Sequence, residues 1–170
     1  MKFISYLIVV CIFLGLHCQT ESLEKRLLLL ENRVKKLNDD ASLFTLKELQ
    51  KENVIVYGMP YNLVSKEFSK DGQVQMIKQT YFGEELKNRE FYFENNVPFY
   101  VRYSTEYFNR EVTSNPNTYE KSDEVADIFF FENGKLIAMR LGKNQQLTTD
   151  EQLLNEKEKF LIQESKLAKH

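Results

Sequence analysis

The sequence predicts an α+β fold: an antiparallel β-meander of about six strands, with N-terminal and C-terminal helices packed on one face. Three pairs of turn residues, Asp71-Gly72, Asn95-Asn96 and Asn133-Gly134, each separate two runs rich in aromatic and β-branched residues. Apolar residues at helical spacing lie on both sides of this central region. The expected organisation is a signal peptide at 1–17, a helical segment and connector at 18–60, and the sheet with the C-terminal helix at 61–170.

The three turn pairs predict the hairpins, because Asn, Asp and Gly tolerate the positive φ that a two-residue type I′ turn requires. Phe93-Glu94-Asn95-Asn96 aligns with Phe131-Glu132-Asn133-Gly134, so the hairpin is expected to be a repeated unit. A looser turn at Phe82–Glu85 links the first two hairpins. The predicted strands lie near 61–69, 73–82, 86–94, 97–107, 125–132 and 135–141. The segment Asn109–Glu124 is the longest predicted loop.

Helical spacing begins at Ser22 and continues to Phe44, with heptad positions at Leu23, Leu27, Leu30, Val34 and Leu37. Two interpretations remain open. The apolar stripe, widened by Leu28 and Leu29, suits a helix on its own sheet, whereas the heptads suit a homo-oligomer stalk. Asn38–Asp40 predicts an interruption, Ser42–Glu52 a second, shorter helix, and Asn53–Gly58 a strand or extended connector.

The C-terminal helix is expected to open at Thr148, because Glu151 follows at the spacing of a capping box. One apolar stripe continues along the helix and is expected to cover one sheet face. Its members are Leu153, Leu154, Phe160, Leu161, Leu167 and Ala168.

The first 17 residues have the parts of an export signal, with Lys2 ahead of an apolar run from Ile4 to Leu16. This run is shorter than the roughly 20 apolar residues of a membrane span. Cys18 stands where a lipoprotein cysteine is acylated, although His17 occupies a position where a small residue is usual. We therefore expect a lipid anchor at Cys18, in the periplasm or on the outer surface. Plain secretion and an uncleaved N-terminal anchor are the alternatives.

The side-chain inventory argues against several chemistries. The two histidines are His17 and the last residue, His170, so the expected mature body has no internal imidazole for a Ser-His-Asp or Cys-His site. No metal site, cofactor or Gly-rich phosphate loop is predicted. A net charge of −2 argues against nucleic acid as a partner. A carboxylate-based hydrolase remains an alternative, resting on Glu84, Glu85, Glu94, Glu106, Asp123, Glu124, Asp127 and Glu132.

Strand alternation places Phe99, Val101, Tyr103 and Tyr107 on one side of the fourth predicted strand. The other side carries Tyr100, Arg102, Ser104 and Glu106. Aromatic residues with Arg and acid are typical of protein interfaces. The candidate interaction face is therefore Tyr92, Tyr100, Arg102 and Glu106; alternatively, its tyrosines are half-buried sheet residues.

The segments Glu90–Asn96 and Phe129–Ile137 resemble the Tyr-Tyr-Phe-x-Asn/Asp-Gly-Lys-Leu hairpins of small exported bacterial lipoproteins of the Bacteroidota type. Asn96 and Val97 depart from the Gly-Lys of that pattern. The resemblance implies a location and a fold; the group has no established activity and supplies no catalytic residues. We expect a non-catalytic envelope lipoprotein or secreted protein that binds another protein or a surface component. A periplasmic inhibitor or immunity-type protein and a structural oligomer are further alternatives.

Overall fold

The computed structural model describes residues 22–83, 85–108 and 121–169. The predicted signal at 1–17, Cys18 and most of the predicted loop at 109–124 lie outside the described residues. The chain divides into two compact units, residues 1–36 and 37–170. The described part of the first unit is helical, within a helix that runs over residues 22–39 and exposes Leu28 and Leu29. The helix ends at the predicted interruption, 38–40.

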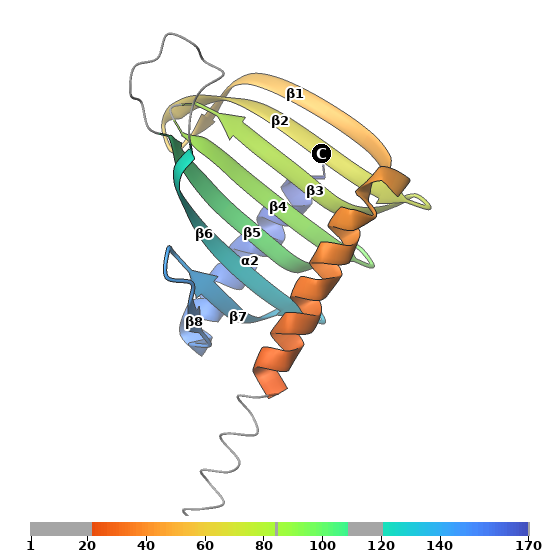
Figure 1. Ribbon diagram of the computed structural model, residues 1–170, viewed down its shortest axis with the longest axis vertical. Coiled ribbons are helices and arrows are strands. Elements are labelled where there is room, and N and C mark those ends of the chain that lie inside the picture. Colours follow the sequence, from red (N-terminus) through yellow and green to blue (C-terminus); the bar gives the residue numbers. More distant parts are fainter. Residues whose placement is uncertain (1–21, 84, 109–120, 170) are drawn as a thin grey trace, which may run out of the picture. The chain divides into compact units, whose positions relative to one another are not determined.

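The second unit contains an eight-stranded antiparallel sheet in which each strand pairs with its neighbours in the chain (Figure 1). In the chain, a helix precedes this meander and another follows it, so the predicted α+β class is confirmed. The strands are β1 (Thr45–Val56), β2 (Met59–Lys70), β3 (Gln73–Phe82), β4 (Leu86–Glu94), β5 (Val97–Phe108), β6 (Lys121–Glu132), β7 (Lys135–Leu141) and β8 (Gln146–Thr148). A 3₁₀ turn, η1 (Ala41–Leu43), precedes them and α2 (Glu151–Leu167) follows.

The predicted turn pairs close the β2–β3, β4–β5 and β6–β7 hairpins, and all six of their residues have φ between 50° and 78°. A fourth turn of this kind, which the sequence did not predict, joins β1 to β2 at Tyr57-Gly58, with φ of 50° and 81°. Tyrosine rarely occupies this backbone region, whereas glycine enters it freely. Gly58 therefore favours a turn at this position, whereas Tyr57 is not a residue from which a turn is predicted.

The three polar hairpins share one irregularity, which supports the repeat that the sequence indicates. Two residue pairs past each turn, the register shifts by one residue. The extra residues are Gln75, Phe99 and Ile137, each third after its turn. A bulge of this type breaks the alternation of side chains between the two faces. Phe99 consequently contacts Tyr92, with ring centroids 6.4 Å apart, and does not follow the simple alternation that grouped it with Val101.

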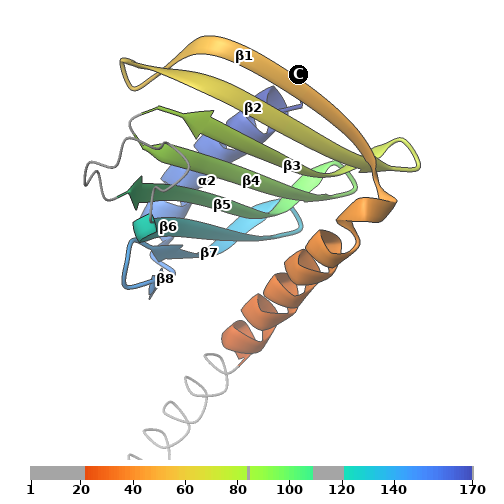
Figure 2. The same ribbon diagram turned by 45° about the horizontal axis from the view of Figure 1, so that its top comes forward.

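The main hydrophobic core lies between one face of the sheet and α2, which crosses that face diagonally (Figure 2). The sheet contributes Ile77, Phe91, Phe93, Val101, Phe129, Phe131 and Met139, and α2 contributes Leu154 and Leu161. Of the predicted helical stripe, Phe160 and Leu167 remain largely exposed, at 46% and 66%. A smaller cluster of Tyr61, Leu63 and Tyr81 forms where β2 and β3 extend beyond the main core.

Three boundary predictions were wrong. Ser42–Glu52 is not a second helix, because Thr45 onward forms β1, and the sheet has two more strands than expected. Lys121–Glu124 belong to β6, not to the loop. Asp150, not Thr148, caps α2: its carboxylate accepts a hydrogen bond from the Leu153 N–H at 2.9 Å, while Thr148 ends β8. Asp and Thr are both good N-caps, so the sequence alone did not decide which of the two residues caps the helix.

Candidate functional site

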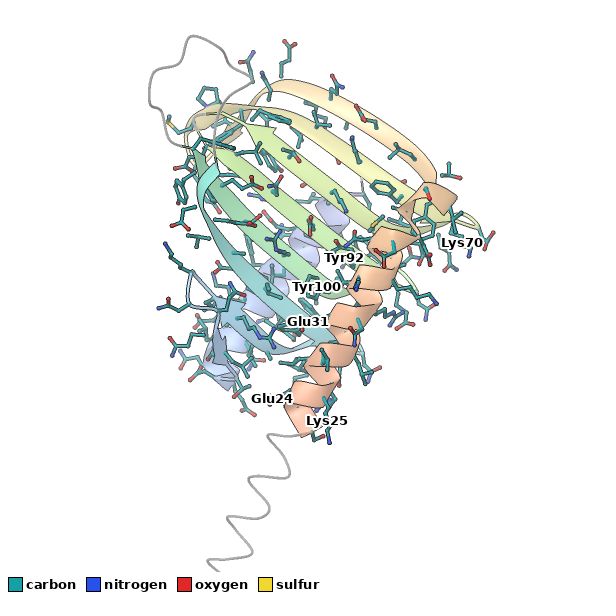
Figure 3. All side chains as sticks on the ribbon, in the orientation of Figure 1. Glu24, Lys25, Glu31, Lys70, Tyr92 and Tyr100 are labelled. Atoms are coloured by element: carbon teal, nitrogen blue, oxygen red, sulfur yellow. The ribbon has the colours of Figure 1, made fainter. Side chains whose placement is uncertain are left out.

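The four residues of the predicted interaction face lie on the face of the sheet opposite α2. Cross-strand pairing places Tyr92 beside Tyr100 and Glu90 beside Arg102, with Glu106 further along β5. The core residues Phe91 and Val101, which pack with α2, alternate with these positions. Figure 3 shows Tyr92 and Tyr100 as close neighbours.

Tyr92 and Tyr100 are buried residues of this face, at 0% and 5% exposure. Their rings meet edge to face at 5.6 Å, and Tyr100 meets Phe130 in the same way at 5.5 Å. The Tyr92 hydroxyl lies within hydrogen-bond distance of Asn38 and donates to Glu90 at 3.2 Å. Burial raises the pKa of Tyr92, and the neighbouring Glu90 raises it further. Both tyrosines are therefore packing groups and not exposed anchors for a partner.

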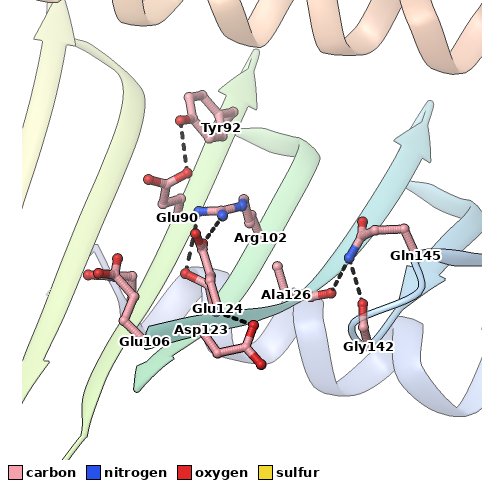
Figure 4. Close-up of polar contacts among 11 residues, drawn as sticks. Glu90, Tyr92, Arg102, Glu106, Asp123, Glu124, Ala126, Gly142 and Gln145 are labelled. Carbon is pink, nitrogen blue, oxygen red and sulfur yellow. Dashed lines mark hydrogen bonds and ion pairs between the residues drawn. The ribbon is translucent and has the colours of Figure 1, made fainter. Parts of the chain in front are cut away.

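The polar members of this face are largely satisfied by one another. Arg102 forms an ion pair with Glu124 across β5 and β6, and Figure 4 shows the two side chains pointing toward each other. Asn88 donates to Glu106 at 3.1 Å. Among the described residues, no buried side-chain nitrogen or oxygen lacks a hydrogen-bond partner. A partner that bound here would have to replace these internal bonds.

A second set of contacts joins the α2 face of the sheet to the helix. Glu164 of α2 accepts hydrogen bonds from Tyr103 at 2.7 Å and from Arg89 at 3.1 Å. The Arg89 guanidinium also lies over the rings of Tyr81 and Tyr103, 5.1 and 5.4 Å from their centroids. Desolvation by burial raises the pKa of Tyr103, and its bond to the carboxylate acts in the same direction. This network is a structural clamp between helix and sheet.

Five exposed apolar side chains lie at one end of the sheet, where the β1–β2 and β3–β4 turns and the end of β5 lie. The sequence did not single them out. The signal available was the apolar character of the residues around Gly58, because turns are normally polar. The set is Ile55, Tyr57, Met59, Phe82 and Tyr107, between 41% and 83% exposed. We call these five residues the apolar end.

The side chain of Lys87 lies beside the apolar end, next to Tyr57. The Lys87 ammonium is 5.6 Å from the ring centroid of Tyr57 and 5.2 Å from that of Tyr61, and 3.4 Å from the Glu85 carboxylate. Partial burial opposes the charged form, but the Tyr61 hydroxyl and Glu85 outweigh it and hold the pKa of Lys87 above its usual value. Tyr57 remains 83% exposed beside this charge. Aromatic surface next to a fixed cation suits a protein surface that offers apolar and acidic groups.

The opposite end of the sheet carries a shallow pocket of about 260 Å³ between the β4–β5 and β6–β7 turns. Glu94, Asn95, Asn133 and Gly134 line it, together with Val97, Pro98 and Phe99.

The candidate acids of the sequence do not form a metal centre in the described ranges. No group of three or more His, Cys, Asp or Glu side chains there is arranged so that it could hold a metal ion. Glu48 and Asp123 each have a lowered carboxyl pKa, first because of a side-chain hydrogen bond, from Gln50 and Lys143 respectively. A general acid needs the opposite shift.

Within the described part of the chain, no helix is both long and apolar enough to cross a membrane. Comparison with protein-family models, with curated proteins and with solved structures finds no match for this chain.

Proposed function

We propose that this protein is a non-catalytic envelope module that binds another protein through the apolar end of its sheet. Exposure of Ile55, Tyr57, Met59, Phe82 and Tyr107 at one end of a single sheet is the observation that carries the proposal. Isolated exposed apolar side chains are ordinary, but a local group of them is typical of interaction sites. Tyr57 and Lys87 add an aromatic surface and a fixed positive charge.

The rest of the described surface gives less support to a catalytic alternative. Two carboxyl groups with a shifted pKa, Glu48 and Asp123, favour their ionised forms. Tyr92 and Tyr103 have strongly raised pKa values, with burial as the leading cause, and each hydroxyl is hydrogen-bonded within the protein. Such groups stabilise the sheet without needing a substrate. A carboxylate hydrolase therefore ranks below a binding module.

The proposed location is the cell envelope, through a lipid on Cys18 after removal of residues 1–17. The supporting observations are the apolar run from Ile4 to Leu16 and the position of Cys18 at its end. Intact mass spectrometry of the membrane fraction from native host cells is expected to give the mass of the acylated chain beginning at Cys18. An unmodified soluble product would contradict the lipid anchor and leave plain secretion.

Binding is tested by quantitative capture from envelope extracts, comparing the wild type with a variant that combines Ile55→Ser and Phe82→Ser. The variant is expected to lose the specifically enriched partner, because both changes remove exposed apolar surface at the same end. A matched control combines Phe160→Ser and Leu167→Ser, two comparably exposed apolar residues on α2. Equal enrichment by the wild type and both variants would argue against the apolar end as the binding surface.

A further inference from the structure

Strand β1 forms one edge of the sheet, and in the described residues it pairs with β2 alone. It is 12 residues long, and its first nine residues are exposed on both faces. The other edge is β8, which has three residues. A long edge strand presents unpaired backbone N–H and C=O groups to which another extended chain can add as a further strand. The two edges are therefore unequal, and β1 is the one available for this mode of binding.

The side chains of β1 divide the edge into two faces of different charge. Glu48 is neutralised on its own face: it accepts from Gln50 at 2.9 Å and lies 3.6 Å from the Lys66 ammonium. Lys47 and Lys51 lie on the opposite face, either side of Leu49. In the part of the chain described here neither lysine takes part in an ion pair, although Lys47 lies opposite Glu67 in register. This face offers two lysines outside any ion pair of the described residues, on either side of the exposed Leu49.

A second copy of the chain is a poor occupant of the charged part of this edge, residues 47–51. Two β1 strands related by a twofold axis pair antiparallel, and the residue on the axis faces its own copy. Axes at Lys47, Glu48 or Lys51 bring two identical charges together. An axis at Leu49 places Lys47 opposite Lys51, and an axis at Gln50 places Glu48 opposite Glu52. Like charges directly opposite destabilise a strand pair.

We propose that β1 binds an extended segment of a partner protein that carries the pattern acid-x-apolar-x-acid. The two acids would lie opposite Lys47 and Lys51, and the apolar residue would pack on Leu49. The intervening positions would face Glu48 and Gln50, so uncharged polar residues are favoured there. β1 ends at Val56, beside Tyr57 of the apolar end, so both surfaces can engage one partner. The inference rests on the proposed binding function and names the chemistry of its partner.

The test uses the purified full chain and a fluorescent peptide, acetyl-Thr-Glu-Thr-Val-Thr-Glu-Thr-amide. A control peptide carries Lys in place of both Glu. The acidic peptide is expected to bind at least about tenfold more tightly than the control peptide. In the control, two cross-strand charge pairs change from attraction to repulsion. The double variant Lys47→Glu with Lys51→Glu is expected to reverse this preference. Backbone amide shifts in the NMR spectrum are expected to concentrate on residues 45–52.

A matched variant, Lys70→Glu with Lys135→Glu, makes the same change of net charge at two exposed lysines outside β1 and is expected to keep the wild-type preference. Equal binding of both peptides, no binding of either, or an unchanged preference after the β1 substitutions would overturn the inference. Sedimentation as a dimer that the peptide dissociates would identify a second copy as the occupant and would also overturn it. Capture by the Ile55/Phe82 variant tests the apolar end, and peptide binding tests β1. Either proposal can therefore fail without the other.

Discussion

The Tyr103 hydroxyl donates a 2.7 Å hydrogen bond to Glu164 Oε2, and this contact ties α2 to the middle of the sheet. Arg89 reaches the same carboxylate from the neighbouring strand, with Nη1 3.1 Å from Oε2. Three side chains separated widely in sequence thus meet at one partly buried point. The helix is held there by polar bonds of defined geometry in addition to the contacts of Leu154 and Leu161 with the core.

Replacing Tyr103 by Phe is expected to lower the free energy of unfolding by about 1.5–3 kcal/mol, the range for a hydrogen bond to a charged group. The ring and its edge-to-face contacts with Phe91 and Phe129 are retained, so the change isolates the hydroxyl. Denaturant unfolding measures the effect. Tyr57→Phe is the control, because Tyr57 is 83% exposed and its change is expected to fall within about 0.5 kcal/mol. Equal effects of the two substitutions would refute the clamp.

Stability is expected to decline in alkali because of the buried tyrosines. The folded-state pKa values of Tyr92 and Tyr103 are raised above the ordinary value of 10.0, first by burial. Above that pH the unfolded chain releases these protons while the folded chain keeps them, so folding is opposed. The contribution of these two tyrosines to the free energy of unfolding is fully present below pH 10.0. It is lost as the pH rises toward their folded-state pKa values.

Unfolding experiments across this alkaline range check the prediction. The double variant Tyr92→Phe with Tyr103→Phe is expected to show a shallower decline than the wild type, even though it is less stable near neutral pH. Its near-ultraviolet titration is expected to lack the late phenolate component of the wild type. Parallel declines in both proteins would show that other groups control the alkaline transition.

The parts of the fold that the sequence predicted are those set by a local conformational requirement. Asp71, Asn95 and Asn133 enter positive φ in hairpin turns because their residue types tolerate it, with no reference to the rest of the chain. The helix over residues 22–39 likewise ends where Asn38–Asp40 interrupts the apolar spacing. Turn residues and helix periodicity were sufficient to place the central strands in order.

β1 was missed because its residues prefer another structure. Leu46, Glu48, Leu49 and Lys51 are good helix formers, and Leu43, Leu46 and Leu49 recur at a spacing of three. Pairing along β2 overrides this preference, through contacts that only the assembled sheet supplies. Its location at the edge of the sheet leaves the strand available for a partner strand.

The candidate face was placed by alternation, but its exposure could not be predicted. Alternation depends on the strand alone, whereas burial of Tyr92 and Tyr100 depends on ring contacts across three strands. These are an edge-to-face contact of Tyr100 with Phe130 and a tilted contact of Tyr92 with Phe99. Phe99 reaches Tyr92 only through the bulge after the Asn95-Asn96 turn, and no residue type marks that bulge. The apolar end, in turn, combines residues from three separate parts of the sequence.

The start of α2 provides a direct test of the corrected cap. Asp150→Ala is expected to lower the free energy of unfolding by about 1 kcal/mol, because it removes the 2.9 Å bond from Leu153 N–H to the capping carboxylate. Thr148→Ala is the comparison, since Thr148 pairs with Met139 in the sheet and does not cap the helix. Denaturant unfolding of both variants decides between the two residues. A larger cost for Thr148→Ala would favour the capping box that the sequence suggested.

Gly83 is expected to tolerate no side chain, although its φ is unexceptional. A Cβ at this position would lie 2.6 Å from Cδ1 and Cε1 of the Tyr61 ring, and Tyr61 is only 6% exposed. The ring also faces Lys87 and packs edge to face on Tyr81 at 6.4 Å, so it cannot shift without loss. Gly83→Ala is therefore expected to destabilise the fold by about 1–3 kcal/mol, the usual cost of overpacking.

A double-mutant cycle with Tyr61→Leu separates this clash from a general effect on the β3–β4 turn. If the ring is the obstacle, Gly83→Ala costs much less in the Tyr61→Leu background, because leucine has no atoms where the ring edge lies. The two substitutions then show a coupling energy of at least about 0.5 kcal/mol, as residues in contact do. Additive effects would place the cost in the backbone of the turn and would show that the Tyr61 ring moves freely. In that case Lys87 would lose one of the two rings that fix it at the apolar end.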